Sequence, residues 1–219
     1  MKNILFTLYS ILIFSITAHS ADWSTWGGDA TRNMVSLETD LDLDFNPGEM
    51  NDDETVDMST TQNVKWVAKL GSQAYGNVTI GNGRVFAGTN NESPRDEGKK
   101  GDRGVVMCFD EKSGELDWQL VIPKLGAGKV SDWEYIGVCS SPAIEGDRVY
   151  VVTNKCEVVC LDIAGFSNGN DGPFMDEASY VKPKGTQDLL NEKLDADILW
   201  IYDMRDQLGV FPHNVTSSS

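Results

Sequence analysis

Short apolar runs separated by glycine-containing turns dominate the chain after an irregular N-terminal part. The most distinctive unit spans residues 105–118: an apolar run, a turn that contains Asp110, Ser113 and Gly114, and a second run that ends at Trp118. Runs of this kind, rich in valine and aromatic residues and bounded by turn residues, are typical of β-strands. The pattern therefore predicts antiparallel hairpins built around tight turns.

A hairpin of this kind occurs twice. In the first copy, Asn82-Gly83 lies between two alternating runs, which is a strong hairpin signal because both turn positions need a positive φ. Residues 142–154 overlay residues 78–90 at a constant offset of 64 positions, and residues 157–162 then overlay residues 105–110. The order of the elements is the same in both copies, so the chain contains an internal repeat.

The second copy carries an insert. Asp110 lies 8 residues before Trp118 in the first copy, whereas Asp162 lies 38 residues before Trp200 in the second. The extra residues fall at about 163–197. Because long insertions in a repeat tend to lie on one face, often the binding face, we expect this insert to present loops to a partner.

The turn at residues 110–118, Asp-Glu-Lys-Ser-Gly-Glu-Leu-Asp-Trp, resembles the tryptophan-docking repeat of β-propellers of the pyrroloquinoline quinone (PQQ) type. That repeat has Asp, Thr-Gly and Trp at these intervals, and Ser113 here takes the place of the threonine. The hairpin at residues 146–150 is similar to the middle of such a blade, and residues 23–33 resemble the start of exported bacterial members. The resemblance covers most of residues 63–219.

The resemblance implies an all-β fold, a β-propeller of four-stranded antiparallel blades, of which about two to three are present in residues 63–219. In the family the tryptophan packs between adjacent blades, so Trp66, Trp118 and Trp200 are expected to be buried wedges. A complete propeller has about four to eight blades. We therefore expect the chain to be an N-terminal fragment of a longer protein.

The first twenty residues have the pattern of a secretory signal peptide. Lys2 precedes an apolar run from Ile4 to Thr17, and small residues at Ala18 and Ser20 favour cleavage after Ser20. The run is shorter than the roughly twenty residues that a membrane span needs, although an uncleaved anchor is the alternative. We expect residues 1–20 to be removed, no membrane span after cleavage, and a periplasmic or secreted location.

The mature chain is strongly acidic. Removal of the signal peptide leaves 17 basic and 34 acidic side chains, a net charge of −17, which excludes nucleic acid as a favoured partner because phosphate backbones are repelled. Residues 21–62 are interpreted as an N-terminal docking segment followed by an acidic connector. Asp40, Asp42 and Asp44 alternate as in a calcium loop, but the glycine and the glutamate that such a loop requires are missing. A solvated connector is favoured over a metal site.

Four cysteines in an exported chain allow one or two disulfides. If the second hairpin turns at residues 145–147, Cys139 comes close to Cys156, and the Cys139–Cys156 disulfide is the preferred pairing. Cys156 and Cys160 lie about 13 Å apart on an extended strand, too far to share a metal ion without a turn. Cys108 and Cys160 occupy matching positions in the two copies and are expected to be small buried hydrophobes.

No set of catalytic residues can be assigned. His19 leaves with the signal peptide, so His213 is the only histidine, and a Ser/His/Asp triad is not supported. The family that the chain resembles includes quinone enzymes that hold PQQ with calcium. The alcohol dehydrogenases among them usually carry a pair of adjacent cysteines, and this chain has no such pair. The cofactor is therefore unknown, with PQQ and calcium as the open alternative, and no metal ligand is assigned.

Two classes of function follow from the resemblance. The favoured one is an exported PQQ-like propeller repeat protein that acts as a binding or scaffold module, has no catalytic site in this chain, and engages a protein or glycan partner through its loops. The alternative is part of a PQQ-dependent dehydrogenase, an oxidoreductase with a redox group held at the propeller axis. The oligomeric state is left open.

Overall fold

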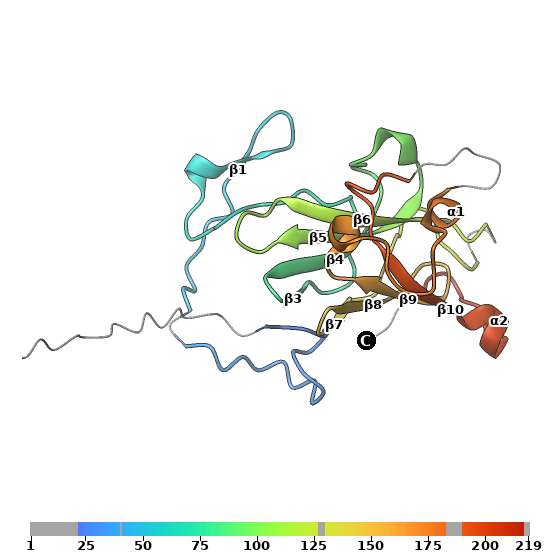
Figure 1. The fold of residues 1–219 in the computed structure, drawn as a ribbon. Helices are drawn as coiled ribbons and strands as arrows, with labels where there is room; N and C mark the ends of the chain where they lie inside the picture. The colour runs from blue at the N-terminus through green and yellow to red at the C-terminus, as the bar shows by residue number, and fades with distance from the viewer. Residues whose placement is uncertain (1–21, 40, 127–129, 183–189, 217–219) are drawn as a thin grey trace, which may run out of the picture.

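The computed structural model describes residues 22–39, 41–126, 130–182 and 190–216. The predicted signal peptide lies outside the described residues. Two four-stranded antiparallel sheets and a two-stranded hairpin make up most of the regular structure, with few and short helices. Figure 1 shows the two larger sheets one above the other. This arrangement confirms the predicted all-β fold with propeller-like blades of four antiparallel strands.

The first sheet, blade 1, has its strands in chain order across the sheet. These strands are β3 (Thr79–Gly81), β4 (Arg84–Asn90), β5 (Arg103–Asp110) and β6 (Leu116–Pro123). Asn82 and Gly83 form the predicted two-residue turn between β3 and β4, with φ values of 53° and 73°. Positive φ at both positions matches the right-handed twist of the flanking strands, so the local sequence is sufficient to form this hairpin.

The second sheet, blade 2, repeats this arrangement. Its strands are β7 (Ala143–Glu145), β8 (Arg148–Val152), β9 (Glu157–Asp162) and β10 (Ile198–Asp203). Arg148 pairs with Asp162 between β8 and β9, as Arg84 pairs with Asp110 between β4 and β5. The internal repeat that the sequence predicts is therefore confirmed at the level of strand register.

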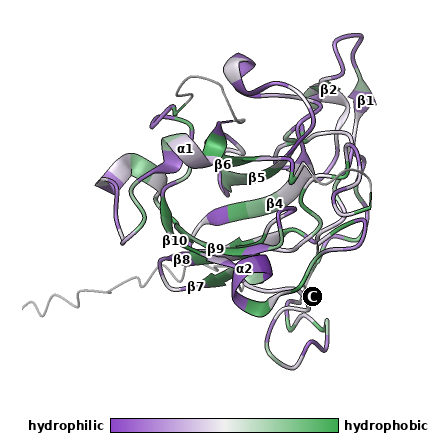
Figure 2. Cartoon of the chain, turned by 90° about the vertical axis from the view of Figure 1, so that its right-hand side faces the viewer, coloured by the Kyte–Doolittle hydropathy of each residue, from purple (hydrophilic) through white to green (hydrophobic). Residues whose placement is uncertain are grey.

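The main hydrophobic core lies between the two blades. Blade 1 contributes Phe86, Val106 and Trp118, and blade 2 contributes Val149 and Leu161, all at 2% exposure or less. Burying one such side chain fully contributes about 1.5–3 kcal/mol relative to leaving it exposed. Figure 2 shows the hydrophobic colour concentrated on the strands, whereas much of the peripheral loop structure is hydrophilic. Packing of one blade on the other is thus a main source of stability.

A second, smaller core covers the other face of blade 1. Val105 and Phe109 pack there against an extended segment before β3, residues 64–70. The ring centroid of Trp66 in this segment lies 6.3 Å from that of Phe109. Both faces of blade 1 are therefore at least partly covered, one by blade 2 and the other by a single extended segment.

The N-terminal segment joins the first strands of both blades. Trp23 exchanges two backbone hydrogen bonds with Ile80 of β3, at 2.9 and 3.0 Å, and the carbonyl of Ser24 accepts from the N–H of Ile144 in β7 at 2.8 Å. The acidic connector that follows contains β1 (Glu49–Met50), β2 (Val56–Asp57) and a 3₁₀ turn (Met58–Thr60). The first strands of the two blades, β3 and β7, are thus held together by the N-terminal segment.

The insert between β9 and β10 packs against β6, the last strand of blade 1. Its described parts contain a 3₁₀ turn (Gly165–Asn168) and helix α1 (Glu177–Val181). Near its end, Gln119 of β6 donates its backbone N–H to Leu194 and accepts from the N–H of Ala196. The insert therefore covers a strand edge that would otherwise offer unpaired backbone groups.

Two further short helical segments complete the fold. A 3₁₀ turn (Glu97–Lys99) lies in the loop between β4 and β5, and α2 (Met204–Leu208) follows β10 directly. Helix α2 ends at Gly209, whose φ of 64° is the left-handed conformation that favours glycine after a helix. Across the described ranges, no helix has the length and apolarity that a membrane crossing requires.

Candidate functional site

The predicted docking motif forms the contacts that join one blade to the next. The indole Nε1–H of Trp118, in the last strand of blade 1, donates to the carbonyl of Ile163 in blade 2 at 3.0 Å. The indole Nε1–H of Trp66 donates to the carbonyl of Glu111 in blade 1 at 2.9 Å, and both bonds span 45 positions in the chain. The same contact therefore occurs twice in the same register.

A glycine with a positive φ lies against each of these two rings. The φ values are 74° at Gly114 and 56° at Gly165. A Cβ at Gly114 would lie 2.5 Å from the ring of Trp66, and one at Gly165 would lie 2.8 Å from the ring of Trp118. Backbone conformation and lack of space both require glycine here, so this part of the motif serves the docking of the tryptophan.

Asp110 closes the turn on which Trp66 docks. Its Oδ1 accepts hydrogen bonds from the backbone N–H groups of Ser113 at 2.7 Å and Lys112 at 3.0 Å, and from the hydroxyl of Ser113 at 2.9 Å. The hydrogen bonds from Ser113 lower the pKa of Asp110, because they stabilise the charged carboxylate. The aspartate and serine of the motif thus have a structural role in the turn.

The third tryptophan departs from the prediction. Trp118 is 2% exposed, whereas Trp200 at the equivalent position is 38% exposed and Trp66 is half-buried. Trp200 packs on Tyr150 with ring centroids 6.1 Å apart, as Trp118 packs on Phe86 at 5.8 Å. The expectation of three buried wedges is therefore correct only for Trp118. Trp118 and Trp66 each dock on the turn of the sheet that follows them, although only Trp118 is fully buried, whereas no described segment covers Trp200 in this way.

The predicted Cys139–Cys156 disulfide is wrong, because all four cysteines are free. The prediction required the hairpin of blade 2 to extend back to Cys139, but β7 pairs with β8 only from Ala143 onward. Upstream of that point, the N–H of Val138 donates to the carbonyl of Thr89 in blade 1 at 3.1 Å. The residue before Cys139 is therefore hydrogen-bonded to blade 1 and does not continue the pairing of β7 with β8.

The other two cysteines behave as predicted. Cys108 and Cys160 are 0% and 1% exposed, and they lie opposite Trp118 and Trp200 on the neighbouring strands. Burial raises the pKa of the Cys160 thiol to about 11 and also raises the pKa of Cys108. Since the thiolate is the nucleophilic form, both groups are inert at neutral pH and act as small apolar side chains.

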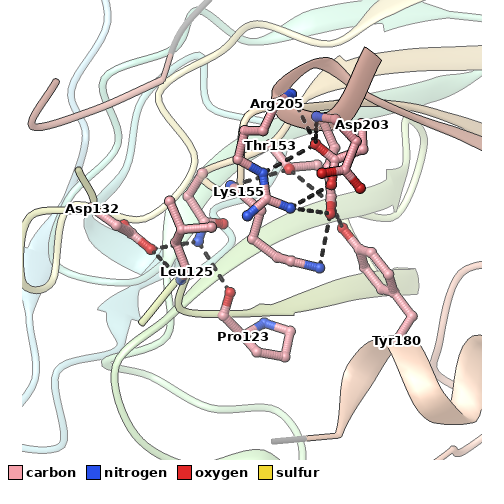
Figure 3. Close-up of polar contacts among 11 residues, drawn as sticks. Pro123, Leu125, Asp132, Thr153, Lys155, Tyr180, Asp203 and Arg205 are labelled. Carbon is pink, nitrogen blue, oxygen red and sulfur yellow. Dashed lines mark hydrogen bonds and ion pairs between the residues drawn. The ribbon is translucent and has the colours of Figure 1, made fainter. Parts of the chain in front are cut away.

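A polar network lies where β8 turns into β9, and Figure 3 shows its side chains converging from several elements. Its centre is Glu157, the first residue of β9, which is 4% exposed. One carboxylate oxygen accepts from the Tyr180 hydroxyl at 2.9 Å, and the other lies 2.9 Å from Nζ of Lys155. Tyr180 belongs to α1, so the insert supplies one member of this network.

The network is balanced in charge. Arg205 of α2 lies 3.6 Å from Glu157 and pairs with Asp203, so two acidic groups face two basic ones. Nζ of Lys155 also lies 4.4 Å from the ring centroid of Tyr180, a cation–π contact. Burial and the charge of Glu157 raise the pKa of Tyr180 well above its usual value. The tyrosine therefore stays protonated, and the arrangement is suited to holding elements together.

Asn90 and Asn154 form a second repeated contact, and the sequence shows their equivalence but not their role. Asn154 aligns with Asn90. Asn90 is the last residue of β4, and Asn154 follows the end of β8. Nδ2 of Asn154 donates to the carbonyl of Pro123 at 3.2 Å, and Asn90 Nδ2 donates to the hydroxyl of Ser72 at 3.0 Å. Each asparagine thus binds the end of the preceding strand or segment. The equivalent positions of Asn90 and Asn154 in the two copies of the repeat are the sequence feature that could have identified this contact.

An exposed aromatic surface lies beside the loop between β6 and β7. Trp133 and Tyr135 of this loop are 46% and 47% exposed, and Tyr75, from the segment before β3, is 60% exposed. Tyr75 and Trp133 line a cavity of about 520 Å³ together with Cys139 and residues 214–215. Tyr75 and Trp133 therefore reach solvent around one cavity, and Tyr135, two positions after Trp133, is exposed as well.

The main chain that carries these rings is fixed at several points. The N–H of Trp133 donates to the carbonyl of Asn214 at 2.7 Å, and Nζ of Lys124 donates to the carbonyl of Trp133 at 2.6 Å. Nδ2 of Asn90 in blade 1 donates to the carbonyl of Tyr135 at 2.6 Å. A backbone held in this way presents aromatic side chains without a large entropic cost of ordering on binding. We refer to Tyr75, Trp133 and Tyr135 as the aromatic surface.

Comparison with known protein families places the repeats in context. The chain matches the family described as outer membrane protein assembly factor BamB, over residues 52–166 and again over residues 78–208. No curated protein matches the chain at a significant level. The two overlapping matches cover both blades, the docking contacts and the insert. The chain therefore belongs to this family of PQQ-like β-propeller repeat proteins.

Proposed function

We propose that the chain is an exported, periplasmic or secreted, propeller repeat protein that acts as a binding and scaffold module. The observation that carries the proposal is the aromatic surface, in which the carbonyl of Tyr135 accepts a hydrogen bond from Asn90 of blade 1 and the main chain of Trp133 is held by Asn214 and Lys124. Tryptophan and tyrosine offer large, rigid contact areas and are enriched in binding interfaces. The partner is a protein or a glycan that packs against Tyr75, Trp133 and Tyr135.

The roles of the other distinctive residues support a module without catalysis. Trp66 and Trp118 dock blade on blade, and Asp110 stitches a turn. Glu157 has its charge balanced by neighbouring basic groups. A nucleophile or general base must be activated by a partner or a shifted pKa, and the thiols of Cys108 and Cys160 are shifted in the inert direction.

A quinoprotein dehydrogenase is the alternative that an experiment has to separate. Quinone-dependent alcohol dehydrogenases with a PQQ-type propeller usually stack the quinone on a disulfide between adjacent cysteines. None of the four cysteines here is adjacent to another in sequence, and all four are free. The residues present do not fit that way of holding a quinone.

Reconstitution with quinone distinguishes the two functions. Full-length protein is mixed with an excess of PQQ and Ca²⁺, passed through a gel-filtration column, and its absorbance spectrum is recorded alongside a dye-linked alcohol oxidation assay. We expect the quinone to elute apart from the protein and no substrate-dependent dye reduction. A stoichiometric chromophore that co-elutes with the protein, together with dye reduction, would establish the dehydrogenase instead.

Export is tested on the protein recovered from its native host. N-terminal sequencing of material from the periplasmic or extracellular fraction should begin at Ala21, because small residues at Ala18 and Ser20 suit signal peptidase. Protein that retains Met1 and stays in the membrane fraction would support an uncleaved anchor.

A further inference from the structure

Three carboxylates of blade 2 and its insert lie close enough together to share one cation. Asp162 ends β9, Asp171 lies in the loop after the 3₁₀ turn, and Asp197 immediately precedes β10. One oxygen from each lies within 4.8 Å of the other two. Two oxygens that each bind one Ca²⁺ ion at about 2.4 Å can be at most about 4.8 Å apart, so these three oxygens are close enough to share an ion.

The repeat shows what is different about Asp162. In the first copy, the equivalent Asp110 accepts three hydrogen bonds at one oxygen, two of them from Ser113. In the second copy the insert takes the place of that serine, and Oδ1 of Asp162 accepts from the N–H of Ala164 at 2.7 Å. Its Oδ2 has only longer contacts, at 3.4 and 3.5 Å. Oδ2 of Asp162 therefore has no short hydrogen bond, although its carboxylate lies close to the other two.

Asp197 carries an unsatisfied atom. The residue is 0% exposed, and its Oδ2 accepts from the N–H of Asp171 at 2.9 Å. Its Oδ1 is buried and has no hydrogen-bond partner within the described part of the chain. A buried carboxylate oxygen that lacks a donor is costly, and native structures contain few of them unless an ion or water supplies the contact.

The charges in this region are also unbalanced, in contrast to the network around Glu157. Of the basic side chains in the described ranges, only Arg148 forms an ion pair with the three carboxylates, at 3.4 Å from Asp162. A cation in their midst would compensate the excess of negative charge.

We propose that Asp162, Asp171 and Asp197 bind a calcium ion that joins the start, the loop and the end of the insert. Calcium takes six to eight oxygen ligands in flexible geometry, so three carboxylates leave positions for water, whereas magnesium demands shorter distances and a near-ideal octahedron. Asp171 is exposed and leaves one side of the group open to solvent. The ion fixes the conformation of the insert, which delivers Tyr180 to Glu157.

Calcium alone, without quinone, is the probe that tests this site. Full-length protein stripped with a chelator is titrated with Ca²⁺ by calorimetry, and its melting temperature is measured with and without the ion. We expect one saturable site and a higher melting temperature, with a weaker response to Mg²⁺. Asp171→Asn removes one of the negative charges around the ion and should weaken calcium affinity at least about tenfold, because the neutral amide oxygen is a poorer ligand for Ca²⁺ than a carboxylate oxygen. Glu192→Gln, an exposed carboxylate of the same insert, is the matched control and should bind like the unchanged protein.

A second variant separates a metal ligand from a structural aspartate. In Asp197→Asn the amide oxygen still accepts from Asp171 and the amide nitrogen donates to a neighbouring carboxylate. The metal-free variant should therefore melt at a higher temperature than the metal-free unchanged protein, and calcium should no longer raise its melting temperature. The proposal is overturned if the unchanged protein shows no calcium response, or if Asp171→Asn and Asp197→Asn respond as it does.

Discussion

Trp118 and Trp200 occupy equivalent positions in the two blades and differ in what covers them. Trp118 is buried and donates to the carbonyl of Ile163, whereas Trp200 is 38% exposed and its indole has no acceptor among the described residues. The same side chain therefore holds two blades together at one position and reaches solvent at the other. This contrast provides a control for the docking bond within one molecule.

Replacement of Trp118 by phenylalanine should lower the free energy of unfolding by about 1–3 kcal/mol, because the buried carbonyl of Ile163 loses its donor. Trp200→Phe is the matched control and should change the free energy of unfolding by no more than about 0.5 kcal/mol. Urea denaturation of both variants measures the difference. Equal losses at the two positions would show that the indole hydrogen bond does not carry the docking energy.

The cysteines differ in burial, and their thiols should therefore differ in reactivity. Cys139 is partly exposed, whereas Cys108 and Cys160 are almost fully buried, and burial raises the pKa of Cys160 to about 11. In native protein at about pH 8 without reductant, iodoacetamide should modify Cys139 first and the two buried thiols only after unfolding, because few of them are thiolates. Mass spectrometry of the labelled peptides gives the order. A Cys139 that reacts only after reduction would point back to a disulfide.

At the scale of elements, local sequence patterns predict the hairpins but not the packing of the insert. The hairpins and their register could be predicted, because turn chemistry at Asn82-Gly83 and strand alternation act between neighbouring residues. The packing of the insert on β6 could not, since it depends on partners such as Lys99 and Asp195, which are 96 positions apart. The carboxylate group was missed for the same reason: Asp162 and Asp197 stand at opposite ends of the insert.

The ion pair between Lys99 and Asp195 ties the insert to the loop before β5. Their atoms are 2.6 Å apart, and both side chains are 1% exposed. Nζ of Lys99 also lies 2.8 Å from Asp96, whose side chain is 19% exposed. Lys99→Met should lower the free energy of unfolding by about 3–5 kcal/mol, chiefly because it leaves the buried carboxylate of Asp195 without its cation. Lys100→Met, at an exposed neighbour, is the control for the loss of a lysine, and urea unfolding is the measurement.

The double variant Lys99→Met, Asp195→Leu removes both buried charges together and leaves Asp96, whose side chain reaches solvent. It should recover most of the lost stability, because replacing a buried ion pair by apolar side chains is often close to neutral. A double variant as unstable as Lys99→Met alone would mean that the charge left on Asp195 is not the cause of the loss.

At the scale of the molecule, one face of blade 2 has no cover within the described ranges. Tyr150, Trp200 and Tyr202 lie on this face, which corresponds to the face of blade 1 that blade 2 buries. Trp200 and Tyr202 are 38% and 40% exposed. Contiguous apolar surface of this kind marks association sites, so the face is the natural place for a further sheet of the same type.

A chain of residues 21–219 should therefore self-associate through this face in a concentration-dependent way. Trp200→Ser combined with Tyr202→Ser should shift it toward the monomer, because the apolar contact is removed. Trp133→Ser, an exposed tryptophan of the aromatic surface, is the control and should leave association unchanged. Sedimentation velocity over a range of concentrations measures the effect. An unchanged chain that stays monomeric throughout would rule out this face as an association surface.

The central claim is that the aromatic surface binds a partner. A photo-crosslinking amino acid placed at Trp133 or Tyr135 tests it in the native host, with Lys112 as the exposed control. Lys112 lies beyond the opposite end of β6, an eight-residue strand about 25 Å long. Irradiation should give a discrete adduct of higher mass from positions 133 and 135 and none from position 112. Protease or glycosidase sensitivity then identifies the partner as protein or glycan. The absence of an adduct at 133 and 135, or the same adduct at all three positions, would contradict the proposed binding function.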